Sequence, residues 1–300
     1  MRKIKIASAL VGVLMSLSIF GSSVGAADLQ PTIDQQKKER AEEVLQWLSD
    51  YNSKKIRIKA LEEQLNNQQE QMGTLSSAQS SAASEELNHL KEDVAYTEEN
   101  FEELSGLVKV NPEDYGVELN IAASDGTVEF EGTMYYDSLF VNAFIVNVDY
   151  EWIDTQYYNQ KNGNGDVGGY DGFSIGLNKP ILTVSETANV YDHHFGEIQD
   201  DVTFYQSYST HGRGWRWQDE IITGMYGTDN YNSHYGIFDL YFEFDDEPSD
   251  GDRTQYYGSY AHTWDETSIN SIGVGPYSAS IGWSNAGSEW EDADQWIYTH

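Results

Sequence analysis

From residue 106 onward, large apolar and polar side chains alternate with a period of two, which is the period of a β-strand. Within residues 140–152 every second side chain is large and apolar, with Asn142 as the one exception. The opposite face of this segment starts apolar and turns polar at residues 147–151, which predicts a strand covered on both faces at one end only. Residues 238–245 alternate in the same way and predict a strand with one face buried and one face in water.

The rest of this region predicts short strands joined by turns rich in Gly, Asp and Asn. Alternation at 277–283 predicts one more strand, and Gly275-Pro276 is typical of the turn before it. Further strands are expected at 127–135, 172–177, 181–191, 202–209, 215–223, 256–264 and 267–274. No helical pattern separates these segments, so residues 106–300 are predicted to form an antiparallel β-sandwich or jelly-roll-like domain.

Residues 28–105 carry a different pattern, in which apolar side chains recur every seven residues. A capping box from Thr32 to Gln35 predicts the start of a first helix. The main line of the repeat runs through Val44, Tyr51, Ile58, Leu65 and Met72. A Ser/Ala-rich stretch at 73–84 interrupts it, and Ser84 is a suitable cap for a second helix. We therefore expect a helical, coiled-coil-like hairpin in front of the β domain.

Three roles are open for this hairpin. It can be a spacer or a packing partner for the β domain, or its apolar seam can join two copies of the chain into a homo-oligomer. Insertion into a membrane is disfavoured, because the hairpin carries many charged side chains.

The first 27 residues have the three parts of a secretory signal peptide. A basic start at residues 2–5 is followed by an apolar run at 6–20 and by small residues at 21–27. An apolar run of about 15 residues is short for a membrane-spanning helix, which needs about 20. We therefore expect cleavage after Ala26 or Ala27, and a secreted bacterial protein that has no stable membrane insertion afterwards.

Charge and composition narrow the classes of partner. The 300 residues include 17 Lys and Arg against 50 Asp and Glu, which gives a formal net charge of −33. Nucleic acids and anionic membrane surfaces are also negatively charged, so neither is expected as a partner. The sequence contains no cysteine, which excludes disulfide bonds, thiolate metal sites and a cysteine nucleophile.

Extracellular calcium is the cofactor that this acidic composition favours, because Ca²⁺ prefers oxygen ligands. Two loops place several side-chain oxygens close together. The candidate ligands are Asn162, Asn164 and Asp166 in the first loop, and Asp245, Asp246, Asp250 and Asp252 in the second. The first loop resembles the front half of an EF-hand loop but lacks its sixth-position glycine and its closing glutamate, so solvated polar turns are the alternative.

Histidines offer weaker evidence for a metal. No pair has the spacing of a zinc-protease helix motif. A transition-metal site would need separate strands to bring residues such as His193, His211 and His234 together.

Paired carboxylates are the candidates for catalysis. Glu129 and Glu131 lie two positions apart on an expected strand, so both side chains are on one face, roughly 6.5 Å apart. That spacing is compatible with the two carboxylates of a glycoside hydrolase. A nucleophile elbow and a phosphate-binding glycine loop are both missing from the sequence.

Aromatic residues are abundant, with 21 Tyr, 8 Trp and 11 Phe. Tyr and Trp tolerate one wet edge, and exposed rings beside Asp and Asn can stack on sugar rings while the polar groups bind the hydroxyls. The candidate ligand-binding rings are Trp215, Trp217, Tyr256, Tyr257 and Trp264. The alternative is that these rings pack against one another across strands.

These observations favour a secreted, non-catalytic binding protein that recognises an extracellular glycan or cell-envelope polymer through exposed Tyr and Trp, with calcium as structural support. One alternative is a secreted jelly-roll glycan hydrolase or lyase that uses a carboxylate pair. Another is a secreted β-rich toxin or antimicrobial factor that assembles on a target cell.

Overall fold

A computed structural model describes most of the chain after the predicted signal peptide. The described residues are 32–70, 77–110, 128–153, 165–194, 196–200, 202–223, 229–249, 251–264, 267–284 and 289–299. The helices are α1 (Ile33–Glu70), α2 (Ser77–Glu99) and α3 (Phe101–Ser105). The strands are β1 (Leu107–Val110), β2 (Val128–Asp137), β3 (Ala143–Trp152), β4 (Gly165–Leu177), β5 (Ile181–Tyr191), β6 (Tyr205–Ser209), β7 (Gly212–Thr223), β8 (Asp229–Tyr231), β9 (Tyr235–Phe244), β10 (Arg253–Thr263), β11 (Ser268–Val274), β12 (Ala279–Ser284) and β13 (Glu289–Thr299).

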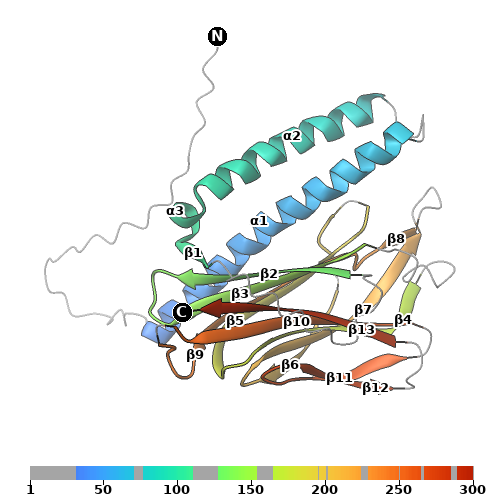
Figure 1. Cartoon of the computed structure of the whole chain (residues 1–300). Coiled ribbons are helices and arrows are strands. Elements are labelled where there is room, and N and C mark those ends of the chain that lie inside the picture. Colours follow the sequence, from blue (N-terminus) through green and yellow to red (C-terminus); the bar gives the residue numbers. More distant parts are fainter. Residues whose placement is uncertain are drawn as a thin grey trace, which may run out of the picture.

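Two antiparallel sheets pack face to face and form a β-sandwich (Figure 1). The five-stranded sheet has the order β1-β2-β3-β9-β5, and the six-stranded sheet has the order β13-β10-β4-β7-β6, with β8 paired to β7. The core between them combines Val146 and Phe238 of the first sheet with Phe173 and Trp215 of the second. The predicted fold class, a mainly β sandwich preceded by a helical hairpin, is confirmed.

Strand β3 shows how the sequence pattern places its side chains. Its even-numbered residues, such as Phe144 and Val146, lie in the core of the sandwich. Its odd-numbered residues face the helices, and there Ala143 and Ile145 are buried against α1. The polar continuation of that face lies under a cleft described below, so the strand has the predicted apolar and polar ends.

The prediction that β9 has one face in water is wrong. Asp239 and Tyr241 on that face are both 0% exposed. Helix α1 packs over this face, so the alternation marks two different buried environments rather than core and solvent.

Helix α1 packs on the outer face of the five-stranded sheet from its N-terminal part as far as Ile56 (Figure 1). Val44, Leu45 and Leu48 are buried there with Tyr135 and Tyr241. Helix α2 runs antiparallel to the C-terminal half of α1, and ion pairs between charged side chains join the two helices. The ion pairs are Lys54–Asp93 (2.5 Å), Arg57–Glu86 (2.8 Å) and Lys91–Glu62 (2.5 Å). The hairpin is therefore a packing partner of the sheet, whereas pairing of two copies stays a prediction.

None of the described helices is long and apolar enough to span a bilayer. Three strands, β1, β8 and β13, were not predicted from the sequence. Strands β1 and β8 are only four and three residues long. In β13 the carboxylates Asp292 and Asp294 interrupt the apolar alternation that would reveal a strand.

Candidate functional site

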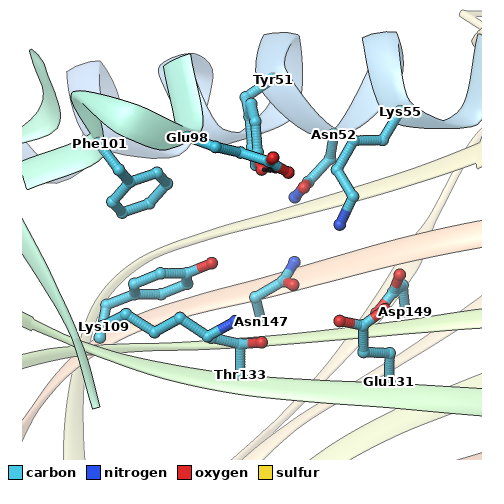
Figure 2. A pocket seen from close by; sticks show the side chains of 11 residues that line it. Tyr51, Asn52, Lys55, Glu98, Phe101, Lys109, Glu131, Thr133, Asn147 and Asp149 are labelled. Carbon is cyan, nitrogen blue, oxygen red and sulfur yellow. Dashed lines mark hydrogen bonds between the residues drawn. The ribbon is translucent and has the colours of Figure 1, made fainter. Parts of the chain in front are cut away.

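A cleft of about 390 Å³ lies between the helical hairpin and the outer face of the five-stranded sheet. Figure 2 shows that side chains from both sides converge on it. Its lining consists of Tyr51, Asn52, Lys55, Glu98, Phe101, Lys109, Glu131, Thr133, Tyr135, Asn147 and Asp149. The volume is within the range of small-molecule sites, about 300–1,000 Å³.

The local structure explains why these residues meet. Odd-numbered residues of β2 and β3 all face the helices, and the antiparallel register places Glu131 opposite Asp149 and Thr133 opposite Asn147. On α1, Tyr51 and Lys55 are four residues apart and therefore lie on the same helix face. The cleft is thus formed by a helix face over the polar end of a strand pair.

Aromatic rings close one end of the cleft. The rings of Phe101 and Tyr135 are stacked with 5.3 Å between their centroids, and Tyr51 contacts Phe101 edge-on at 5.8 Å. The Tyr51 hydroxyl donates a hydrogen bond to Glu98 (3.1 Å). Burial, followed by the nearby Glu98 carboxylate, raises the pKa of Tyr51, so the phenol is neutral and remains a donor. This end therefore offers an apolar wall with polar groups at its edge.

The floor of the cleft is a buried hydrogen-bond network. The Asn147 side-chain amide donates to Asp239 Oδ1 (2.8 Å), and the Thr187 hydroxyl donates to Oδ2 of the same carboxylate (2.8 Å). Burial raises the pKa of Asp239 to about 6, although both hydrogen bonds act in the opposite direction. These contacts hold the Asn147 amide in one orientation, facing the cleft.

Glu131 and Asp149 form a cross-strand carboxylate pair at the other end of the cleft (Figure 2). Burial raises the pKa of Asp149 to about 7, and the neighbouring Glu131 adds to this rise, whereas Lys55 and Lys59 reduce it. Glu131 itself is exposed at the rim. Near neutral pH, Asp149 can therefore hold or release a proton beside a second carboxyl group.

A smaller hollow of about 240 Å³ continues past this pair, because Glu131 and Asp149 line both spaces. Glu129 lines only the smaller hollow, where Lys59 also lies and donates to Glu151 (2.6 Å). The candidate catalytic residues Glu129 and Glu131 do share one face of β2, as predicted. In the structure each of them is paired with an acid across the strands, Glu151 and Asp149 respectively.

The prediction that a set of Trp and Tyr rings forms an exposed face is wrong for four of its five members. Trp215 and Trp217 are 0% exposed, and Tyr256 and Tyr257 are at most 2% exposed. Two of these four rings have hydrogen-bond partners inside the protein: Trp217 Nε1 donates to Ser233 Oγ (3.0 Å), and the Tyr257 hydroxyl donates to the Gly275 carbonyl (3.0 Å). Trp264 is partly exposed and stacks on the ring of His262 at 6.0 Å.

The calcium prediction falls partly outside the described residues, which omit Asn162, Asn164 and Asp250. Asp166 lies in β4, while Asp245 and Asp246 are exposed. Asp252 forms an ion pair with Lys179 (3.0 Å). Calcium binding by these loops stays a prediction.

Two of the three histidines considered for a metal come together. The rings of His193 and His234 are 4.1 Å apart between centroids, and His194 stacks on His193 at 5.0 Å. His211, the third histidine considered, has its Nδ1 at 3.1 Å from the Thr210 hydroxyl.

A different group meets the geometry of a metal site. Among the described residues, Asp171, Asp219 and His262 are the group of at least three potential ligands whose donor atoms all lie within 4.8 Å of one another. Each of them is 0% exposed. They come from three neighbouring strands of the six-stranded sheet, β4, β7 and β10, and face the core. Sequence reasoning missed this group because its members are separated by 48 and 43 positions along the chain.

Hydrogen bonds surround Asp171 in this cluster. Its carboxylate accepts hydrogen bonds from the Tyr260 hydroxyl (2.6 Å) and the Thr263 amide (2.9 Å), and His262 Nδ1 lies 3.0 Å from Oδ2. The Tyr231 hydroxyl donates to Asp219 Oδ2 (2.8 Å). Burial, followed by the neighbouring Asp171 carboxylate, raises the pKa of Asp219 well above its usual value.

Comparisons with known proteins find only distant structural likenesses. No family model and no curated protein matches the chain. The collagen-binding domain of a Staphylococcus aureus adhesin aligns with 57% of this chain and 98% of its own length, at 8% identity and a TM-score of 0.24. AvmM, which catalyses macrocyclization in alchivemycin A biosynthesis, aligns with 56% of this chain and 86% of its own, at 11% identity and a TM-score of 0.21. Neither likeness assigns a ligand or a reaction to this chain.

Proposed function

We propose that this protein is an extracellular binding protein for a glycan or cell-envelope polymer, and that one sugar unit occupies the cleft between the hairpin and the five-stranded sheet. The observation that carries this proposal is the composition of the cleft wall. It combines the aromatic side chains Tyr51, Phe101 and Tyr135 with two amides, a hydroxyl, three carboxylates and two ammonium groups.

This mixture suits a polyhydroxylated ligand. A sugar presents an apolar C–H face and neighbouring hydroxyl groups that both donate and accept hydrogen bonds. Carboxylates accept, ammonium groups donate, and the amides of Asn52 and Asn147 do both. The lining contains both carboxylates and ammonium groups, so no single sign of charge dominates, and a strongly charged ligand is favoured less than a neutral one.

The first test is binding of the full chain to neutral oligosaccharides, with Glu131→Ala as the variant. Removing a charged acceptor from a bound hydroxyl is expected to weaken binding about 10- to 100-fold, measured by titration calorimetry after a glycan array has identified the ligand. Glu129→Ala is the matched control, because Glu129 is exposed on the same strand face but lies outside the cleft. If both variants weaken oligosaccharide binding equally, or if neither variant weakens it, the cleft is not the binding site.

Glycoside hydrolysis is the second candidate function, and the Glu131–Asp149 pair favours it. A buried carboxyl group whose pKa is raised to about 7, next to a second carboxyl group, is an arrangement suited to general acid catalysis of glycoside hydrolysis. In this mechanism protonated Asp149 gives its proton to the leaving glycosidic oxygen, and Glu131, or a water molecule that Glu131 activates, attacks the anomeric carbon.

Hydrolysis makes a prediction that binding alone does not. Release of reducing ends from the bound oligosaccharide is expected to decline as the pH rises through about 7, because Asp149, whose pKa is about 7, loses its proton. Asp149→Asn is expected to abolish this release and to leave binding intact. If the ligand binds and no reducing ends form at any pH between 5 and 8, the protein is a binder and not a hydrolase.

A further inference from the structure

The cluster of Asp171, Asp219 and His262 concentrates negative charge in an apolar environment. The ring of Trp152 contacts His262 edge-on at 5.0 Å, and Tyr150 stacks on Tyr260 at 4.4 Å beside it. In the described part of the chain, His262 is the only basic side chain within ion-pair distance of the two aspartates. Two buried carboxylates are costly unless protons or a cation neutralise them.

The donor atoms match a transition metal better than calcium. His262 Nδ1 lies 3.0 Å from Asp171 Oδ2 and 3.9 Å from Asp219 Oδ2. Ligands at about 2.0 Å around a tetrahedral zinc ion are about 3.3 Å apart, so small side-chain rotations would bring these three donors to the spacing of three of its four ligands. Calcium instead takes six to eight oxygen ligands, and an imidazole nitrogen does not suit it.

The second oxygen of the Asp219 carboxylate provides separate evidence for a bound ligand. Asp219 Oδ1 is buried and accepts no well-formed hydrogen bond from any residue that the structure describes. An oxygen in this position loses the solvation of water without compensation, unless another group binds it.

The Asp171 carboxylate is held in place by hydrogen bonds from residues around the cluster, as metal ligands usually are. The Thr263 amide binds Asp171 Oδ1, while the Tyr260 hydroxyl binds Oδ2. Tyr231 reaches both aspartates, at 2.8 Å from Asp219 and 3.4 Å from Asp171. Such contacts fix the orientation of ligands and leave their remaining lone pairs for a metal ion.

We propose that Asp171, Asp219 and His262 form a structural site for a divalent transition-metal ion, with Zn²⁺ as the ion that the donor set fits best. The ion ties β4, β7 and β10 together within the sandwich. Because all three ligands are 0% exposed, the ion is loaded as the chain folds and has a structural rather than a catalytic role.

The test is the metal content and thermal stability of the full chain, produced without an affinity tag in zinc-supplemented medium. Mass spectrometry of the isolated protein is expected to find about one zinc per chain. After unfolding and refolding, protein refolded with Zn²⁺ is expected to melt about 5 °C or more above protein refolded in EDTA. Refolding with Ca²⁺ is expected to produce no comparable rise.

Variants separate this site from other zinc-binding residues. Asp219→Asn preserves the shape of the side chain and is expected to remove the zinc and the zinc-dependent rise in melting temperature. His262→Gln provides a second variant of the same site. His193→Gln is the matched control. His193 belongs to the other histidine group, so this variant is expected to keep the zinc bound by Asp171, Asp219 and His262.

Two results would overturn the proposal. One is less than 0.1 zinc per chain both in the isolated protein and after refolding with Zn²⁺, which would make the cluster a metal-free hydrogen-bond network. The other is full zinc content in folded Asp219→Asn, with loss in His193→Gln, which would place the zinc at the other histidines. Circular dichroism in the aromatic region shows that each variant compared is folded.

Discussion

Asp149→Asn is expected to raise the free energy of unfolding at pH 8 by about 2 to 4 kcal/mol. Asp149 lies under helix α1, where burial and the neighbouring Glu131 raise its pKa from 3.8 to about 7. At pH 8 the unmodified protein must keep a charged carboxylate in this position, and asparagine removes that charge at nearly constant size. The gain is smaller than a full transfer because Asp149 is partly exposed and two lysines face it.

The sign of the pH dependence follows from the direction of the pKa shift. A folded-state pKa above the unfolded-state value means that folding favours the protonated group. Its contribution to stability is complete below about pH 4 and is lost as the pH rises through about 7. Asp239, whose pKa is about 6, contributes with the same sign over a lower range. The unmodified protein is therefore expected to be more stable at pH 5 than at pH 8.

Urea unfolding at pH 5 and pH 8 measures this effect. The difference between Asp149→Asn and the unmodified protein should be large at pH 8 and should shrink as the pH approaches 4. Asp246→Asn is the control, because Asp246 is exposed in a loop and the substitution removes the same charge. If both substitutions change stability equally at pH 8, the effect comes from net charge and not from burial under the helix.

The strand face that carries Asp149 shows what the sequence pattern can predict and what it cannot. The change from apolar to polar along one face of β3 predicted where cover over the sheet ends, and the cleft lies at that place. A period of two reports which residues share a face, because it depends only on the geometry of one strand. It does not report which strands are neighbours. Glu131 was therefore predicted to work with Glu129 along β2, while its partner in the cleft is Asp149 on β3.

The buried aromatic rings show a second limit of sequence reasoning. Some of the many Tyr and Trp residues were expected to be at the surface, because these side chains tolerate one wet edge. In the structure some of the acids provide hydrogen-bond partners inside the protein: Tyr241 donates to Asp137 (2.9 Å), and Tyr260 donates to Asp171 (2.6 Å). The hydrogen bond lowers the cost of burying both the tyrosine hydroxyl and the aspartate. Which tyrosine meets which aspartate depends on strand register and not on the local sequence.

The strength of such matching can be measured at Asp171. Asp171→Ala is expected to lower the free energy of unfolding by about 4 kcal/mol or more in EDTA. The Tyr260 hydroxyl and the Thr263 amide both donate to this carboxylate and are fully buried, so the substitution takes this charged acceptor away from both. Each buried donor left in this state costs about 1 to 3 kcal/mol.

Asp219→Ala is the matched comparison, because the same substitution is made at an equally buried carboxylate on the adjacent strand β7. Its main donor, the Tyr231 hydroxyl, also lies within 3.4 Å of Asp171 and can turn to that acceptor. The expected cost in EDTA is therefore only about 1 to 2 kcal/mol. Equal costs at the two positions would mean that the hydrogen bonds around Asp171 do not carry the stability assigned to them. With Zn²⁺ both costs are expected to rise by the same amount, because an ion needs both carboxylates, while the difference between the two costs, which the hydrogen bonds set, is expected to stay as it is in EDTA.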